Sequence, residues 1–390
     1  MYVLLQSFHG LRRLRFSVRQ LLRFALVSIV LTRENTSCLS SKYPVRMIDP
    51  TPRDSTALDR LIATPDEKTI EAVRKRPGDF TVLGAGGKMG FHLCLMLQRA
   101  LTALGRKDRV QAVSRFKTVR ARDEFESIGC QAVTADLSCP HELERLPNSE
   151  NVFFLAGVKF GTSHDTALLE KMNVAMPRLV ARRYQHATIV AFSTGCVYSF
   201  VSPMTGGSTE EDATDPPGEY ANSCKGREQA FVDAGLEFGT KTALIRLNYS
   251  IDLRYGVLVD LAQKVLDGKT VDLTTGYVNV IWQGDALRHA IRCLDYATAE
   301  PPFIINITGP EVLRVRDLAD AFGRRFARDV RFSGKEAPTA WLNNASKSHA
   351  LFGKPEVGIE QMIDWVATWL QNKGELLGRP THFELRDGNY

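Results

Sequence analysis

The stretch that decides the fold reads Phe80-Thr81-Val82-Leu83-Gly84-Ala85-Gly86-Gly87-Lys88-Met89-Gly90. Its first four residues are apolar or β-branched and predict a short buried strand. Apolar residues at Met89, Leu93 and Leu97 then recur at the spacing of one helix face. The glycines between these two segments therefore lie in a tight strand-to-helix turn.

This glycine turn predicts a site for the pyrophosphate of a dinucleotide. Gly84 permits the tight turn, the pair Gly86-Gly87 lets a ligand approach the backbone, and Gly90 lets the helix pack closely on the strand. The start of the helix, at Lys88-Met89, offers unpaired N–H groups and the positive end of the helix dipole. A tight turn without a ligand would need the same glycines, but the strand before it and the helix after it favour the binding site.

The chain after Asp79 alternates short apolar runs with amphipathic segments. The expected strands are 80–83, 110–113, 132–135, 152–155, 188–192 and 243–247, and the helices between them are 90–104, 119–128, 165–184 and 222–236. Alternation of this length predicts a parallel sheet with helices on both faces. The expected fold class is α/β, with a Rossmann-type doubly wound parallel sheet and a smaller C-terminal substrate domain.

Beyond Asn248 the alternation loosens into helical segments at 257–267, 284–297, 315–327 and 358–372. We therefore expect four parts: a basic leader outside the fold (1–46), a helical prelude (47–78), a nucleotide-binding Rossmann domain (79–250) and a substrate domain with the tail (251–390). In the prelude, Thr64 before Pro65 predicts a helix start. The polar tail from Arg379 is expected at the surface.

A net charge of +6 would be compatible with nucleic-acid binding, but the positive charges are concentrated at the start of the chain. Residues 1–46 hold eight lysines and arginines and one glutamate, so the remainder of the chain carries a net charge of −1. A basic face for nucleic acid is therefore not expected on the folded part. The leader fits a transit peptide, a signal or anchor, or an extension upstream of Met47, and its apolar run Phe24–Leu31 is too short to span a membrane.

The cysteines and histidines bear on the compartment and on metals. The seven cysteines are scattered without a CxxC pair, which argues for a reducing compartment and against a disulfide framework or a zinc site. The histidines share no HxxxH or HxH spacing, so we expect no metal. The expected location is cytoplasmic, with organelle targeting by residues 1–46 left open.

The end of the second expected strand selects the form of the cofactor. An acidic residue there would bind the ribose 2′-hydroxyl of NAD, whereas a basic residue would bind the 2′-phosphate of NADP. The strand 110–113 is followed by Ser114 and Arg115 and by no acid. This favours NADP over NAD, although an exposed arginine at a helix start would look the same.

Four later motifs occur in a fixed order along the chain. They are Ala135-Asp136-Leu137 after the third strand, Leu155-Ala156-Gly157 after the fourth, Asn173-Val174 on the next helix, and Ser193-Thr194-Gly195-Cys196-Val197-Tyr198 after the fifth. With the glycine turn, they make residues 79–250 resemble the cofactor half of the extended short-chain dehydrogenases/reductases, the NAD-dependent epimerase/dehydratase family. The resemblance implies that the first three motifs line the cofactor, that Thr194 is catalytic, and that a homodimer is possible.

The resemblance also implies a Tyr-x-x-x-Lys motif, in which the tyrosine transfers a proton and the lysine lowers its pKa. Here Tyr220 is followed four positions later by Cys224, and the lysine stands one place late at Lys225. Helix positions i and i+4 lie above one another, whereas i+5 is rotated by about a further 100°, so Lys225 is expected to point away. Lys159, after the fourth strand, is the second candidate for the missing cation. Without a cation, proton transfer would lose about two to three orders of magnitude.

Two functions of different classes remain open at this point. One is an NAD(P)-dependent oxidoreductase or epimerase acting on a carbinol or carbonyl carbon of a small molecule, such as a sugar or sugar nucleotide. The other is a non-catalytic NAD(P)-binding sensor that has lost the active-site lysine. The role of Arg254 also has two alternatives: it binds a substrate phosphate, or it is a solvated loop residue.

Overall fold

The structure, a computed structural model, describes residues 51–117, 119–159 and 165–386. The leader 1–46 and the first residues of the prelude lie outside the described residues. Among the described residues, no helix is long and apolar enough to cross a membrane.

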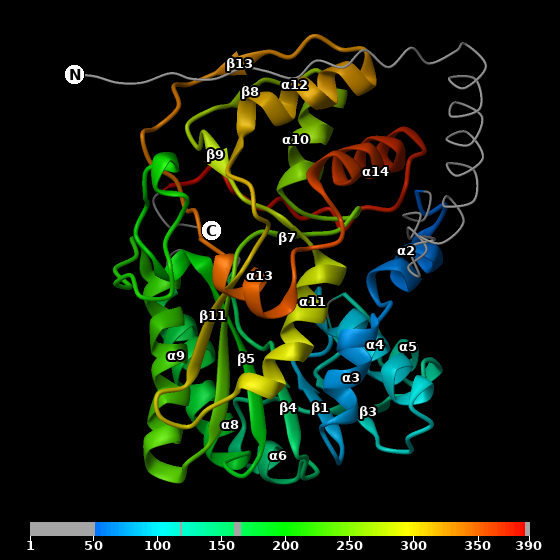
Figure 1. Ribbon diagram of the computed structural model, residues 1–390, viewed down its shortest axis with the longest axis vertical. Coiled ribbons are helices and arrows are strands. Elements are labelled where there is room, and N and C mark those ends of the chain that lie inside the picture. Colours follow the sequence, from blue (N-terminus) through cyan, green and yellow to red (C-terminus); the bar gives the residue numbers. More distant parts are fainter. Residues whose placement is uncertain (1–50, 118, 160–164, 387–390) are drawn as a thin grey trace, which may run out of the picture. The chain divides into compact units, whose positions relative to one another are not determined.

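The described chain contains a seven-stranded parallel sheet, which lies in the lower half of Figure 1. Its order is β11-β6-β5-β4-β1-β2-β3, and its strands are β1 (Phe80–Leu83), β2 (Val110–Ser114), β3 (Gln131–Thr134), β4 (Asn151–Phe154), β5 (Thr188–Thr194), β6 (Lys241–Leu247) and β11 (Phe303–Ile307). The strand order reverses between β1 and β4, and in such sheets the ligand crevice lies at the carboxyl ends of the strands where this reversal occurs. The predicted α/β fold class with a doubly wound parallel sheet is confirmed.

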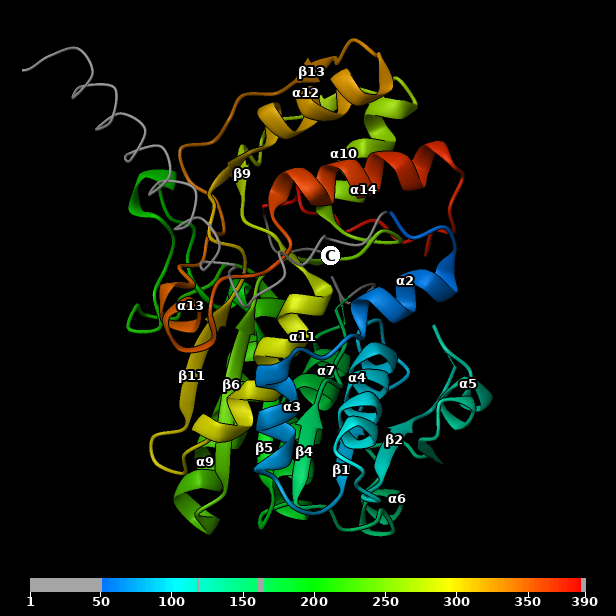
Figure 2. The same cartoon turned by 45° about the vertical axis from the view of Figure 1, so that its right-hand side comes forward.

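Alternate strand residues enter two separate hydrophobic cores, as the period of two requires. In β4, for example, Phe153 belongs to one core, whereas Val152 and Phe154 belong to the other. The first core is closed by α3 (Glu67–Arg74), α4 (Gly90–Ala103) and α11 (Gln283–Arg292), and the second by α8 (Met176–Arg183) and α9 (Glu219–Phe238). Figure 2 shows α3, α4 and α11 together on one face of the sheet. Because both faces are covered, most residues of the inner strands are buried.

Shorter helices complete the connections around the sheet. They are α5 (Arg122–Ser127), α6 (Pro140–Glu144) and α7 (Thr166–Leu169), and α7 continues into α8 through a π-helical turn, Glu170–Ala175. Each lies within a segment expected to be helical or beside an expected strand. The carboxyl end of β4 and the start of α7 flank the undescribed residues 160–164.

The prelude forms two helices, and the expected start at Pro65 is wrong. Helix α2 (Ser55–Ile62) is capped by Asp54, and α3 is capped by Asp66, whose carboxylate accepts from the backbone N–H of Thr69 at 2.8 Å. The Thr64 hydroxyl instead donates to the carbonyl of Arg60 at 2.7 Å, in the last turn of α2. A carboxylate takes the cap position two residues later and leaves Thr64 in the connection.

After β6 the chain builds a second group of elements and also returns to the sheet. The second group contains α10 (Val257–Leu266), α12 (Val315–Phe326) and α14 (Ile359–Gln371), with three strand pairs: β7 (Ser250–Ile251) with β10 (Ile281–Trp282), β9 (Tyr277–Val278) with β12 (Leu313–Arg314), and β8 (Val271–Asp272) with β13 (Phe332–Ser333). Between these elements, α11 covers the sheet and β11 pairs in parallel with β6. Helix α13 (Ser346–Phe352) contacts β11. No strand was expected at 303–307.

The C-terminal tail is not confined to the surface, contrary to expectation. Phe383 is buried in the first core, and Thr381 is buried with its hydroxyl and N–H both donating to Asp260 at 2.6 and 2.8 Å. The tail therefore closes part of the C-terminal group, although its composition is polar.

Candidate functional site

The glycine turn connects β1 to α4 in a conformation that only glycine accepts at two positions. Gly84 has φ +86°, and a Cβ there would stand 2.7 Å from the backbone nitrogen of Ala156 after β4. A Cβ at Gly90 would stand 2.3 Å from the carbonyl oxygen of Ala85. The absence of a side chain at Gly84 and Gly90 therefore lets backbone segments approach each other closely, at the crevice where the strand order reverses.

A first cavity of about 160 Å³, the glycine cleft, follows this turn across the sheet edge. The predicted cofactor residues that line it are Gly84, Gly86, Gly87, Ser114, Arg115, Asp136, Leu137, Leu155, Ala156 and Gly157. They come from the ends of β1, β2, β3 and β4, which are far apart in the sequence. The structure thus brings ten of the predicted cofactor residues to one cleft.

The charged side chains that line the glycine cleft lie near the end of β2. Arg115 lies with its guanidinium 3.8 Å from the Asp136 carboxylate, and its side chain remains about half exposed, at 52%. The Ser138 side chain and N–H both donate to Asp136, which, with the charge of Arg115, lowers the pKa of this carboxyl. Lys117 lines the same end of the cleft. Two cations therefore border the cleft where a dinucleotide would place its adenosine ribose.

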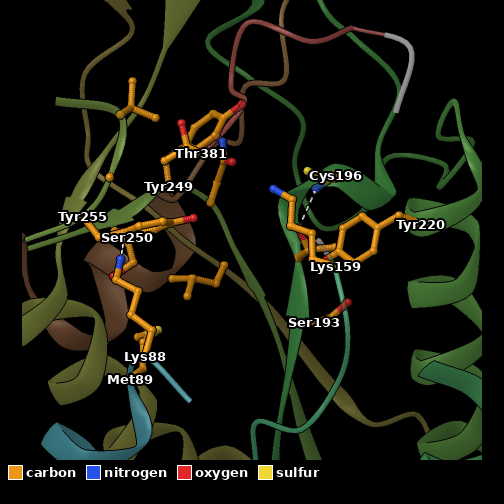
Figure 3. Close-up of a pocket in the computed structure, with 15 residues that line it drawn as sticks. Lys88, Met89, Lys159, Ser193, Cys196, Tyr220, Tyr249, Ser250, Tyr255 and Thr381 are labelled. Carbon is orange, nitrogen blue, oxygen red and sulfur yellow. Dashed lines mark hydrogen bonds between the residues drawn. The ribbon is translucent and has the colours of Figure 1, made fainter. Parts of the chain in front are cut away.

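A second cavity of about 210 Å³ lies at the carboxyl ends of β5 and β6 (Figure 3), and it is called the catalytic cavity after the predicted catalytic residues that line it. Lys159 and Tyr220 lie on one side of it, and Lys88 and Tyr255 lie on the other. Its lining also includes Thr194 at the end of β5, Met89, Ser250, and Thr381 from the tail. Both predicted residues of the helix start, Lys88 and Met89, thus line this cavity rather than the glycine cleft.

Thr194 and Tyr220, the two predicted catalytic residues, line the same cavity from β5 and from the first turn of α9. The hydroxyl of Thr194 accepts from the N–H of Cys196 at 3.2 Å, which fixes the strand end as it turns. Burial, with the neighbouring Cys224, raises the pKa of Tyr220 well above its ordinary value of 10. Its phenol is therefore protonated at neutral pH.

Of the two candidate cations, Lys159 lines the catalytic cavity and Lys225 does not. The Lys159 ammonium lies 5.8 Å from the centre of the Tyr220 ring, whereas Lys225 sits half-buried at the next helix position after Cys224. Cys224 itself is fully buried beside Tyr220. Burial lowers the pKa of Lys159, an effect that the neighbouring cysteines partly offset.

Comparison with known proteins gives matches in structure alone. No protein-family model matches the sequence, and no curated protein sequence matches it. A UDP-glucose 4-epimerase of Thermus thermophilus in complex with NAD superposes with a TM-score of 0.62 at 19% identity, covering 75% of this chain and 99% of that one. A UDP-glucuronic acid 4-epimerase of Bacillus cereus, in complex with UDP-glucuronic acid and NAD, gives 0.61 at 17% identity, over 76% and 99% of the two chains.

A dTDP-glucose 4,6-dehydratase of Streptomyces venezuelae, with NAD bound, gives a TM-score of 0.64 at 17% identity, over 75% of this chain and 96% of that one. The chain has the fold of the extended short-chain dehydrogenases/reductases. The family resemblance predicted from the motifs is thereby confirmed as a likeness of fold. At these identities the likeness extends to the fold and not to the activity.

Within this short-chain dehydrogenase/reductase fold, Asn173 lies behind the wall of both cavities. It is fully buried, and its amide exchanges hydrogen bonds at 3.0 Å with the backbone of Val158, next to Lys159. The same amide donates to Ser223 at 2.9 Å and accepts from Arg227 at 2.6 Å, both on α9. Asn173 therefore positions the Lys159 loop against α9, rather than facing the cleft as the sequence predicts.

A layer of buried, hydrogen-bonded polar side chains lies next to the lining of the catalytic cavity. Ser193 donates to Glu228 at 2.6 Å, and Glu228 pairs with Arg246 at 2.8 Å. Arg246 also donates to the hydroxyl of Tyr198 at 2.8 Å, and that hydroxyl donates to Asn306 on β11 at 2.9 Å. These bonds tie α9, β5, β6 and β11 together next to the strand end that carries Thr194.

The sequence analysis did not single out Asp59 on α2. Its buried carboxylate contacts His92 at 2.7 Å, Arg120 at 2.7 Å and Arg254 at 2.8 Å. Arg254 is thus not a solvated loop residue, because it is buried and paired. No pattern in the sequence joins residues so far apart, so only the structure reveals this cluster.

Among the described residues, no group of three or more histidine, cysteine or acidic side chains could hold a metal ion.

Proposed function

We propose that the protein is an NAD(P)-dependent oxidoreductase or epimerase acting on a carbinol or carbonyl carbon of a sugar or sugar nucleotide. The observation that carries this is the convergence of Thr194, Tyr220 and Lys159, from three separate segments, on one cavity beside the glycine turn. The solved structures with this fold include enzymes that hold NAD and nucleotide sugars.

The residues around the glycine turn fit a dinucleotide. The turn has the close approaches of Gly84 and Gly90, and the first turn of α4 offers N–H groups to a pyrophosphate. Arg115 and Lys117 would bind the 2′-phosphate of NADP, so NADP is the proposed form. When bound, the nicotinamide would supply or accept the hydride.

The side chains of the catalytic cavity supply the proton and hold the reacting oxygen. Thr194 would hydrogen-bond the substrate oxygen, and the protonated Tyr220 would donate its phenolic proton as that oxygen gains negative charge. The raised pKa keeps the Tyr220 phenol protonated but makes it a weak acid, so a nearby cation is needed to stabilise the phenolate that proton donation leaves. Lys159 would supply the positive charge that position 224 lacks.

The cofactor assignment is tested by equilibrium titration of the full chain with NADPH and NADH, followed by nicotinamide fluorescence. The parent should bind NADPH at least tenfold more tightly, because a charge-assisted bond to a phosphate is worth about 1.5–3 kcal/mol. Arg115→Ala should remove most of this preference. Arg122→Ala is the matched control, since Arg122 is exposed on α5 and does not line the glycine cleft. Equal affinities in the parent would refute the NADP assignment.

The catalytic assignment is tested by Tyr220→Phe in a turnover assay with a panel of nucleotide sugars and their keto forms. Turnover should disappear while NADPH affinity stays within twofold, because the phenolic oxygen is the proton donor. Lys159→Met should lower turnover without abolishing it. Undiminished turnover of Tyr220→Phe would remove Tyr220 from the mechanism.

A second candidate function, a non-catalytic NADP-binding sensor, is favoured by one observation. Cys224 is buried where the family lysine would stand. The two candidates differ in a single measurement: a sensor would bind NADPH with the Arg115 dependence described above but would consume none with any member of the substrate panel.

A further inference from the structure

The side chain of Lys88 leaves the glycine turn and enters the catalytic cavity. Its ammonium donates to the carbonyl of Ser250 at 2.9 Å and lies 4.0 Å from the centre of the Tyr255 ring (Figure 3). The residues that line the glycine cleft do not include Lys88. A residue that belongs to the dinucleotide turn by sequence therefore presents its charge to the other cavity.

The charges that line the catalytic cavity are of one sign. The residues that line it include two lysines, Lys88 and Lys159, and neither aspartate nor glutamate. Asp252 and Asp260 attract the Lys88 ammonium by their charge, without a hydrogen bond to it. Burial lowers the pKa of Lys88 to about 8, against the attraction of Asp252 and with the repulsion of Arg254, so the group is still charged at neutral pH.

The buried ammonium of Lys88 is costly in this setting, since desolvation of an ion is offset fully only by a partner of opposite charge. One carbonyl and one aromatic face are weaker partners than a carboxylate. The lysines at 88 and 159 stand on opposite sides of the cavity, so an anion between them would meet positive charge from both. A neutral ligand of the same size would give the Lys88 ammonium no counter-charge.

We propose that the substrate carries an anionic oxygen group, a carboxylate or a phosphate, which Lys88 binds within the catalytic cavity opposite Tyr220. This inference deepens the proposed function, because it rests on that cavity being the substrate site. It makes Lys88 a residue that selects anionic over neutral substrates.

The inference is tested by calorimetric titration of the full chain with malonate, inorganic phosphate and the neutral malonamide, each with and without saturating NADPH. Malonate or phosphate should bind at least tenfold more tightly than malonamide, since a bond between two charged groups contributes more than about 1.4 kcal/mol. The anion that binds more tightly identifies the source as a carboxylate or a phosphate. Equal binding of anion and amide, or binding of neither anion, would overturn the inference.

Variants assign the effect to Lys88. Lys88→Met should weaken anion binding at least tenfold, while Lys107→Met, at a position outside the cavity, should leave anion binding unchanged. Lys88→Gln can still donate to the Ser250 carbonyl and replaces the Met variant if that variant fails to fold. Anion binding that survives in a folded Lys88 variant would overturn the inference.

The two proposals fail in different ways. A chain that binds NADPH but neither anion refutes the inference on Lys88 and leaves the proposed function standing. A chain that binds malonate through Lys88 but does not bind NADPH refutes the proposed function alone.

Discussion

The cluster around Asp59 offers a sharp test of how the prelude is joined to the rest of the fold. Asp59→Ala removes a carboxylate that contacts His92, Arg120 and Arg254, of which His92 and Arg254 are almost fully buried. Arg254 then keeps its contact with the His92 ring, at 3.1 Å, and its ion pair with Asp252, at 3.6 Å. Removing one partner of a buried ionic cluster costs about 3–5 kcal/mol, because the remaining charges stay buried.

This free energy converts to a shift in melting temperature. At about 2 °C per kcal/mol for a large chain, Asp59→Ala should lower the melting temperature by about 6–10 °C. Asp59→Asn keeps an oxygen acceptor and loses the charge, so about half that shift is expected. Asp123→Ala, at an exposed position of α5, is the matched control and should shift it by less than about 1 °C.

The assay is thermal unfolding followed by circular dichroism between pH 3 and 8. Burial opposes ionisation of Asp59, but the hydrogen bond to His92 and the charges of Arg254 and Arg120 outweigh it, so its pKa is lowered. A lowered pKa contributes stability above the unfolded value of about 3.9 and loses it as the pH falls through the folded value. The gap between parent and Asp59→Ala should therefore be constant from pH 6 to 8 and narrow in acid. A shift equal to that of Asp123→Ala would refute the reasoning.

Three further predictions concern the turn, position 224 and the polar layer. Gly90→Ala should lower NADPH affinity at least tenfold in fluorescence titrations, because its Cβ would meet the carbonyl of Ala85 at 2.3 Å, whereas Gly358→Ala, with no neighbour within 4 Å, should leave it unchanged. Cys224→Lys should unfold at lower denaturant than Cys224→Ala, since it buries a further cation in the fully buried position beside Lys159, and equal midpoints would contradict this. Tyr198→Phe should cost about 1–3 kcal/mol in denaturant unfolding at pH 7, because it strands two buried partners. Burial raises the pKa of Tyr198 to about 12, so the stability that this residue contributes below pH 10 is lost between pH 10 and 12, and the variant should lack this part of the alkaline transition.

Much of the fold could be predicted because its signals are local. The strand 80–83 and the helix from Gly90 begin within one residue of the positions that periodicity predicts. The apolar pattern of a buried strand and of the helix after it is complete within about twenty residues of sequence. The strand Phe303–Ile307 escaped prediction because it lies after Asn248, where the alternation of apolar runs and helical segments loosens, and only the sheet places it beside β6. Likewise, Asp66 rather than Thr64 caps α3, a choice between two local acceptors that composition alone did not resolve.

In the candidate site, too, some features could be predicted from the sequence and others only from the structure. The motifs at Thr194 and Tyr220 predicted side chains that the structure brings to one cavity, because the ends of parallel strands share one edge of the sheet. The structure was needed to select Lys159 rather than Lys225 as the cation in the cavity, although helix geometry had already predicted that the Lys225 side chain points away from Tyr220. Asn173 lies beneath the lining of the glycine cleft and not in it, because its side-chain amide is hydrogen-bonded to the backbone of Val158 and to α9.

By itself, then, the sequence determined the glycine turn, the parallel sheet and the strand ends that form the cofactor crevice, because backbone conformation and alternation of apolar residues are encoded locally. Only the tertiary structure decided where the long polar side chains point. Lys88 turns from the glycine cleft toward Ser250, and Thr381 enters the cavity from a polar tail. The direction of such a side chain is set by the burial and charge of neighbours that are distant in the sequence, so no local pattern contains it.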